Sequence, residues 1–261
     1  MRVLAIEGGG IRGIVPATVL VALEERAGRP VAELFDLIAG TSTGGIIACA
    51  LVAPGADPVA GRARFRARDV LALYHEAGPV VFGGEAPEHA LEATLRAGLG
   101  DLRLSDALTD LLVTAYDARA GRPHPFASWA PAPDRPLWEV ARATSAAAPT
   151  FGPLHTVGVA GEPLVLIDGG EVAVDPTPLA HAEALRREPA GEHVVVSLGT
   201  GETVGDGGGP GLHRFQVRLD SVAPDAFTAD AADRARLQAL ADALVVARTD
   251  ELDALAARLA D

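Results

Sequence analysis

Short apolar runs alternate with longer helical patterns over the first fifty or so residues of the chain. Apolar residues from Val3 to Ile6 predict a buried strand, and the apolar spacing over residues 14–27 predicts a helix. A second apolar run over residues 34–39 predicts another strand, and the helical pattern resumes through Leu51. Because strands that alternate with helices are typical of parallel sheets covered on both faces, this region predicts an α/β fold.

The middle of the chain continues this alternation less regularly. Helical spacing recurs over residues 65–77 and 91–99. Apolar runs predict further strands over residues 111–116, 164–167 and 194–198. These segments extend the α/β pattern to about residue 200.

The C-terminal part has a different pattern. Seven glycines within residues 199–211 predict a mobile loop. Over about residues 229–261, leucines recur mostly at three- and four-residue steps, which predicts an amphipathic helix with a break near Thr249. Since the sequence contains neither a repeat nor a convincing linker, we expect a single domain over residues 1–261, with its motif-bearing core in residues 1–201.

Composition narrows the classes of function. The 261 residues carry a formal net charge of −13, which disfavours binding to nucleic acid and strong adhesion to anionic bilayers. The single cysteine, Cys49, excludes an internal disulfide and fits a reducing compartment. The sequence has no signal-peptide pattern and no apolar run near the ~20 residues of a membrane span. We therefore expect a cytoplasmic protein, with export by another route left open.

The run GTSTG at residues 40–44 matches the G-x-S-x-G pattern of a nucleophile elbow. A predicted strand precedes it and a predicted helix follows it. Gly40 and Gly44 permit a sharp turn that lifts Ser42 out of the sheet toward the helix N-terminus, whose dipole favours developing negative charge. An ordinary strand-to-helix turn is the alternative, so Ser42 is a candidate nucleophile that other motifs must support.

The run EGGGIRG at residues 7–13 has two functional interpretations. Gly8, Gly10 and Gly13 match a dinucleotide fingerprint, but the acid that should close the next strand is missing. Alternatively, the amides of Gly8, Gly9 and Gly10 hold an oxyanion at a helix start, with Arg12 orienting the loop or adding positive potential. A purely structural glycine turn is the third interpretation.

The run DGG at residues 168–170 follows the strand predicted over residues 164–167. Taken alone, Asp168, Gly169 and Gly170 would form an ordinary turn. Beside the other two motifs, Asp168 supplies the proton acceptor that a serine nucleophile needs within about 3 Å. An aspartate is a weak base at its ordinary pKa, so burial or geometry must compensate.

Three histidines after Asp168 offer a competing assignment. His181, His193 and His213 make the chain order Ser, Asp, His of α/β-hydrolases formally available. However, Ser42 follows only the second predicted strand, whereas the elbow of an α/β-hydrolase typically follows several. None of the three histidines lies in a motif-like setting, so the Ser-Asp dyad is preferred.

The combination of motifs resembles the patatin-like phospholipase family. The resemblance rests on the three glycine-containing runs above, together with ARATSAAAPTF at residues 141–151 and SLGTG at residues 197–201. Together they cover roughly residues 1–201, in an order and spacing similar to those of the family. Glu7 stands where the family more often has Asp, and the chain is short for the family, which suggests a reduced lid or acyl-chain pocket.

The resemblance implies a three-layer α/β/α fold with a mixed, mostly parallel central sheet. It implies Ser42 as nucleophile, Asp168 as base and the amides of Gly8, Gly9 and Gly10 as oxyanion hole, with Arg12 beside them. The implied reaction hydrolyses an acyl lipid or other ester in two steps through an acyl-enzyme, with neither metal nor organic cofactor. The implied partners are the lipid and a transiently contacted membrane or micelle surface, not nucleic acid. The rivals are a Ser-His-Asp esterase and a non-catalytic lipid-binding module.

Overall fold

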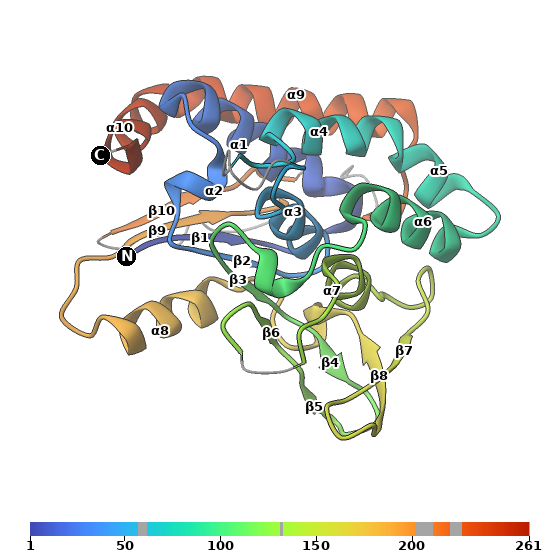
Figure 1. Ribbon diagram of the computed structural model, residues 1–261. Helices are drawn as coiled ribbons and strands as arrows, with labels where there is room; N and C mark the ends of the chain where they lie inside the picture. The colour runs from blue at the N-terminus through green and yellow to red at the C-terminus, as the bar shows by residue number, and fades with distance from the viewer. Residues whose placement is uncertain (57–61, 131–132, 202–210, 220–225, 261) are drawn as a thin grey trace.

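The computed structural model describes residues 1–56, 62–130, 133–201, 211–219 and 226–260 (Figure 1). The strands are β1 (Arg2–Ile6), β2 (Leu37–Gly40), β3 (Asp110–Val113), β4 (Tyr116–Asp117), β5 (Arg122–Pro123), β6 (Phe126–Ala127), β7 (Leu154–Val157), β8 (Pro163–Ile167), β9 (Val194–Leu198) and β10 (Leu212–Phe215). The larger sheet has the order β10-β9-β1-β2-β3-β6 and is parallel except for the pair β3 and β6. The smaller sheet is antiparallel, with the order β5-β4-β8-β7.

Helices cover both faces of the larger sheet (Figure 1). They are α1 (Ile14–Ala27), α2 (Val31–Leu34), α3 (Thr43–Leu51), α4 (Ala67–Glu76), α5 (Gly78–Gly83), α6 (Pro87–Leu99), α7 (Leu137–Thr144), α8 (Thr177–Arg187), α9 (Ala231–Ala247) and α10 (Thr249–Ala260), with 3₁₀ turns η1 (Gly10–Gly13), η3 (Leu104–Asp106) and η4 (Gly169–Glu171). On one face α1 packs against α4, α9 and α10, and on the other α8 contacts β1 and β2. The expected α/β/α sandwich with a mixed, mostly parallel sheet is therefore confirmed.

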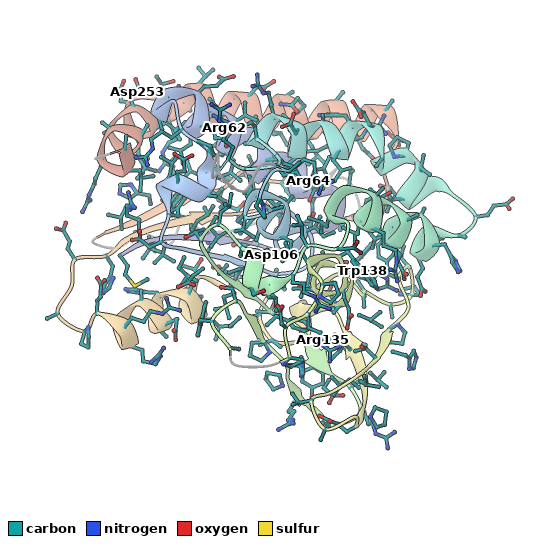
Figure 2. All side chains as sticks on the ribbon, in the orientation of Figure 1. Arg62, Arg64, Asp106, Arg135, Trp138 and Asp253 are labelled. Atoms are coloured by element: carbon teal, nitrogen blue, oxygen red, sulfur yellow. The ribbon has the colours of Figure 1, made fainter. Side chains whose placement is uncertain are left out.

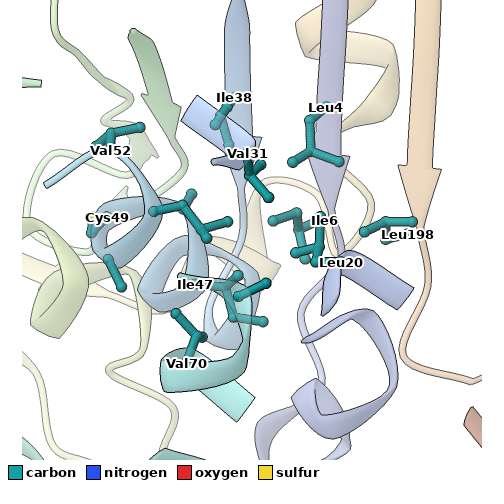
Figure 3. Packing of buried hydrophobic residues seen from close by; sticks show 14 of the residues in the cluster. Leu4, Ile6, Leu20, Val31, Ile38, Ile47, Cys49, Val52, Val70 and Leu198 are labelled. Carbon is teal, nitrogen blue, oxygen red and sulfur yellow. The ribbon is translucent and has the colours of Figure 1, made fainter. Parts of the chain in front are cut away.

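Strand β1 lies at the centre of the sheet and separates two apolar clusters. Because side chains alternate along a strand, Leu4 and Ile6 enter the large cluster beneath α1 and α3, whereas Val3 and Ala5 face α8. Figure 3 shows Leu4 and Ile6 packed near Leu20 of α1. A strand that is buried on both faces reads as a continuous apolar run, which is why its position was predictable.

The structure departs from the expected elements in two places. The apolar run at residues 34–39 is divided between the end of α2 and the start of β2. The expected strand at residues 111–116 is two strands, β3 and β4, that belong to different sheets. The expected C-terminal helix is two helices, with the break between Ala247 and Thr249 as predicted. Most of the expected glycine-rich loop, residues 202–210, lies outside the described residues.

Within the described ranges, no helix combines the length and apolar character needed to cross a membrane.

Candidate active site

Ser42 lies on the turn between β2 and α3. Its φ is 53°, and it is the single non-glycine residue of the described chain with a positive φ. Two glycines make this turn possible. A Cβ at Gly40 would lie 2.2 Å from the carbonyl oxygen of Gly44, and a Cβ at Gly44 would lie 2.1 Å from that of Ile6. Side chains at these positions would therefore push the turn away from β1 and displace Ser42.

The Ser42 hydroxyl is hydrogen-bonded to the candidate base. Its Oγ donates to Oδ2 of Asp168 at 2.7 Å, across 126 positions of the chain. The Ser42 amide donates to Oγ1 of Thr144 at 2.8 Å, which fixes the turn from the side of α7. Thr144 belongs to the run at residues 141–151 that the sequence analysis noted without assigning it a contact. The two residues of the expected dyad are therefore in contact.

Asp168 follows β8 and caps the short turn η4. Its Oδ1 accepts the Gly170 amide at 2.7 Å. Burial raises the pKa of the Asp168 carboxyl, while the hydrogen bonds from Gly170 and Ser42 act in the opposite direction. A Cβ at Gly169 would lie 2.1 Å from Oγ1 of Thr114, so this close approach requires glycine. The DGG run thus holds a half-buried carboxylate with a strengthened affinity for a proton.

The glycine loop after β1 lies beside the serine. A Cβ on Gly8 would be 3.2 Å from the Cβ of Ser42, and Gly10 lines the same cavity as Ser42. The Gly8 amide, however, donates to the carbonyl oxygen of Val174 at 3.0 Å. Within the described part of the chain, the amides of Gly9 and Gly10 donate to no acceptor. Of the three amides expected to bind the oxyanion, that of Gly8 is therefore already engaged by a backbone carbonyl, whereas those of Gly9 and Gly10 can donate to a ligand.

Three further residues shape this loop. Gly10 has φ of +57°, and a Cβ there would lie 2.0 Å from the carbonyl oxygen of Ala226. A Cβ at Gly13 would lie 2.5 Å from Oη of Tyr74. Arg12 donates from Nε to the carbonyl oxygen of Gly9 at 3.3 Å, so its guanidinium helps to orient the loop.

A buried polar network holds the loop from behind. Oε1 of Glu7 accepts from Nη2 of Arg214 at 2.5 Å, and Oε2 accepts from Nε2 of Gln216 at 3.2 Å. Thr200 donates its amide to Glu7 at 3.3 Å and its hydroxyl to the Gly8 carbonyl oxygen at 2.7 Å. Burial raises the pKa of Glu7, and the charge of Arg214 opposes this effect.

Sequence reasoning missed most of this network. Thr200 lies in the SLGTG run at residues 197–201, which was recognised as similar to the family but to which no function was assigned. Arg214 and Gln216 lie in or just after β10 and gave no signal, because an isolated arginine and glutamine in a short strand form no recognisable motif.

An apolar cavity opens beside Ser42. Its walls are side chains of α3, α4, α5 and α6, together with Phe151 and Phe227. Its volume is about 60 Å³, several times the ~10–15 Å³ that one water requires by the same measure. Its few polar groups include the hydroxyls of Ser42 and Ser145. The serine–aspartate pair therefore faces a space suited to hydrocarbon.

The three histidines of the alternative triad make other contacts. His193 shares a hydrogen bond with the carbonyl oxygen of Glu188 at 3.0 Å, and His213 with Oε1 of Glu251 at 3.1 Å. His181 is exposed on α8. Among the described residues that line the cavity beside Ser42, none is a histidine.

The described residues include no group of three or more His, Cys, Asp or Glu side chains that could hold a metal ion.

Comparison with known proteins identifies the family. A family model described as patatin-like phospholipase matches residues 4–182. Patatin-like protein 1 of Oryza sativa subsp. indica is 33% identical over 252 residues, covering 79% of this chain and 60% of the relative. Patatin-16 of Solanum tuberosum is 31% identical over 239 residues, covering 78% of this chain and 61% of the relative. A probable inactive patatin-like protein 9 of Arabidopsis thaliana is 34% identical over 234 residues, covering 77% and 60%.

A solved structure supports the fold independently. The crystal structure of VipD from Legionella pneumophila matches with a TM-score of 0.51 at 13% identity, covering 94% of this chain and 66% of that one. The chain spans about 60% of the length of the curated relatives named above. The matched family model covers well over half of the chain and includes the serine, the aspartate and the glycine loop. The chain therefore belongs to the patatin-like phospholipase family.

Proposed function

We propose that the protein is a lipid acyl hydrolase that cleaves carboxylic esters with a dyad of Ser42 and Asp168. The observation that carries this proposal is the 2.7 Å hydrogen bond from the Ser42 hydroxyl to the Asp168 carboxylate at an apolar cavity. A hydroxyl is a poor nucleophile until a neighbouring group accepts its proton. Asp168 is the group in contact with that proton.

In the first step Oγ of Ser42 attacks the ester carbonyl carbon while its proton passes to Asp168. The carbonyl π electrons move onto oxygen and form an oxyanion. The tetrahedral intermediate then collapses, and the alcohol leaves with the proton that Asp168 returns. In the second step water attacks the acyl-enzyme, Asp168 accepts its proton, and collapse releases the acid and restores the Ser42 hydroxyl.

Stabilisation of the oxyanion is assigned to the glycine loop. The amides of Gly9 and Gly10 are the available donors, because the Gly8 amide already donates to Val174. The start of α3 directly after Ser42 adds a favourable dipole. Gly9 also packs against Thr200, where a Cβ would lie 2.3 Å from Oγ1. Fixed donors of this kind typically lower the barrier of acyl transfer by several kcal/mol, ~3–4 for one donor.

Burial makes the carboxylate a better base. Removal of Asp168 from water raises its pKa, so its affinity for the serine proton is greater than that of an exposed aspartate. A charged partner would oppose this effect, but the two groups that hydrogen-bond to its carboxylate in the described structure, Ser42 and Gly170, are neutral. The aspartate can therefore accept the proton without an intervening imidazole.

The substrate class follows from the cavity and the charge. Apolar walls favour the acyl chain of a lipid, and phospholipids, lysophospholipids and simple acyl esters all share the required bond. A net charge of −13 disfavours firm electrostatic attachment to an anionic bilayer. We therefore expect brief contact with a membrane or micelle surface during substrate uptake.

The rival is a non-catalytic lipid-binding protein with the same fold. The similarity to a relative named probable inactive gives this rival a specific basis. In this chain, however, the serine and the aspartate are both present and in contact. An idle site has no need of that contact.

Labelling with a fluorophosphonate probe separates the two functions, because only an activated serine reacts with it. We expect stoichiometric labelling of the wild type at Ser42 and none of Ser42→Ala. Ser145→Ala is a matched control, since Ser145 lines the same cavity but donates its hydroxyl to the carbonyl oxygen of Ala141 at 2.7 Å. Labelling that persists in Ser42→Ala, or an unlabelled wild type that is folded, would contradict the proposal.

A further inference from the structure

A second apolar cavity lies next to the one at Ser42. Its volume is about 80 Å³, compared with about 60 Å³ for the first. Both cavities are lined by α3, α4 and α6. The described lining of the second includes Ala50, Phe65 and Leu99, none of which lines the first.

The two cavities follow one another along the same helices. On α3, Ser42 and Ile46 line the first cavity, and Ile46 and Ala50 line the second. Since an α-helix rises ~1.5 Å per residue, Ile46 lies about 6 Å and Ala50 about 12 Å along the helix from Ser42. The lining of α6 advances in the same way, from Leu91 to Leu99. The two cavities therefore lie in succession along these helices, and we call the one at Ser42 the first compartment and the other the second compartment.

Four side chains separate the compartments, because each of them lines both. They are Ile46, Leu73, Thr94 and Leu95. Leu95 is the most buried of them, with 4% of its surface exposed. We call this group the partition.

The helix that carries half of the partition is anchored to its neighbour. The guanidinium carbon of Arg96 lies 3.4 Å from the ring centroid of Trp138 on α7, a residue labelled in Figure 2. At the start of α6, Glu88 forms an ion pair with Arg142 at 3.0 Å and accepts the Gly152 amide at 3.1 Å. Contacts at both ends of α6 therefore oppose a movement that would merge the compartments.

We infer that the partition sets the length of the acyl chain that the site accepts. This inference rests on the proposed function. An acyl group bound to Ser42 extends into the first compartment until it meets the partition, and further methylenes remain outside this compartment. Each methylene that enters an apolar site contributes about fourfold to kcat/KM, the equivalent of ~0.8 kcal/mol. The gain with chain length should therefore stop where the first compartment is full.

The test measures kcat/KM for p-nitrophenyl esters from acetate through butyrate, octanoate and laurate to palmitate. For the wild type we expect a rise over the short esters and then a plateau or decline. Leu95→Ala and, independently, Leu73→Ala open the partition and should move the optimum to longer esters, with a gain of about fourfold for each methylene newly buried. Leu73 is only partly buried, so its variant should fold even if Leu95→Ala does not.

Leu99→Ala is the matched control. Leu99 is on the same helix as Leu95, is similarly buried at 3% exposure, and lines only the second compartment. It should lose comparable stability and keep the wild-type optimum. Ile46→Phe should shorten the preferred chain by filling the end of the first compartment.

The outcomes separate the two proposals. A wild type that hydrolyses esters while Leu73→Ala keeps the wild-type profile overturns the role of the partition and leaves the dyad standing. A shift of equal size in Leu99→Ala also overturns it. A folded wild type that hydrolyses none of the esters and resists fluorophosphonate contradicts the proposed function itself.

Discussion

Two carboxylates, the half-buried Asp168 and the buried Glu7, lie close to the glycine loop and differ in their partners. Burial raises the pKa of both. At Glu7 the guanidinium of Arg214 forms an ion pair with the carboxylate and opposes this effect. Asp168 meets the neutral hydroxyl of Ser42 and the neutral amide of Gly170. The comparison indicates that an acid paired with a charged group serves to hold the structure together. An acid whose partners are neutral remains able to exchange a proton.

The largest expected effect is the loss of hydrolysis when the dyad is broken. Ser42→Ala and Asp168→Asn should each reduce kcat/KM for a p-nitrophenyl ester by at least ~10³-fold, because nucleophile and base act as a unit. Circular dichroism and thermal unfolding should show that both variants remain folded.

Glu7→Gln is the matched control, since it makes the same chemical change at the other carboxylate. It should reduce the rate far less than Asp168→Asn and reduce stability more.

Alanine at His181, His193 or His213 should leave the rate almost unchanged. A loss of ~10³-fold in one histidine variant, with Asp168→Asn active, would favour the triad over the dyad.

The next effect concerns stability. Arg214→Met leaves Glu7 buried without its countercharge, and breaking a buried ion pair in this way typically costs ~3–5 kcal/mol. Urea unfolding monitored by fluorescence would measure the loss. The matched control is Arg26→Met, because Arg26 pairs at 2.6 Å with Asp253, whose side chain is 59% exposed. That surface pair should cost no more than ~1 kcal/mol. Equal losses in the two variants would show that Glu7 does not depend on Arg214.

The smallest effect is a shift in pH dependence. The proposed mechanism requires ionised Asp168, so kcat/KM should fall as the pH drops through a pKa that burial raises above the ordinary aspartate range. The charge of Glu171 contributes to this rise, so Glu171→Gln should move the acid limb of the profile to lower pH. Glu25→Gln, on the exposed side of α1, should leave the limb in place. If the acid limb of the Glu171→Gln profile stays where it is in the wild type, Glu171 does not influence the pKa of Asp168.

Ionisation of Asp168 is expected to have opposite effects on activity and on stability. A raised pKa means that the folded state binds the proton more tightly than the unfolded state does. Its stabilising contribution is therefore full below the unfolded pKa and is lost as the pH rises through the folded pKa. Ionised Asp168 is needed for catalysis in the pH range where it destabilises the fold, so Asp168→Asn should unfold at a temperature no lower than that of the wild type at neutral pH.

Much of the fold was predictable because its signals are local. Strand β1 and helix α1 have the expected positions, since an apolar run that ends in glycines and a helix that ends at Gly28 are each marked within a few residues. The smaller sheet was not predictable. Its strands β4 and β5 contain two residues each, which is too short to show a repeating pattern, and β4 pairs with β8 some fifty positions away.

In the candidate site, too, some features could be predicted from the sequence and others could not. The turn at Ser42 and the DGG run at Asp168 follow strict steric demands for glycine, and such demands leave a readable pattern. The hydrogen bond from the Gly8 amide to the Val174 carbonyl oxygen could not be predicted from the sequence, because any residue can supply a backbone carbonyl. Arg214 was equally hidden, since its role depends on β10 lying in the same sheet as β1.

The position of β1 has a consequence for the synthesis of the chain. This strand leaves the ribosome well before one of its two neighbours in the sheet, β9, which ends at Leu198. A nascent chain must therefore keep a largely apolar strand unpaired on one edge until β9 has been made, and such edges attract other chains. Chaperone binding to the emerging β1 segment would protect it during that interval.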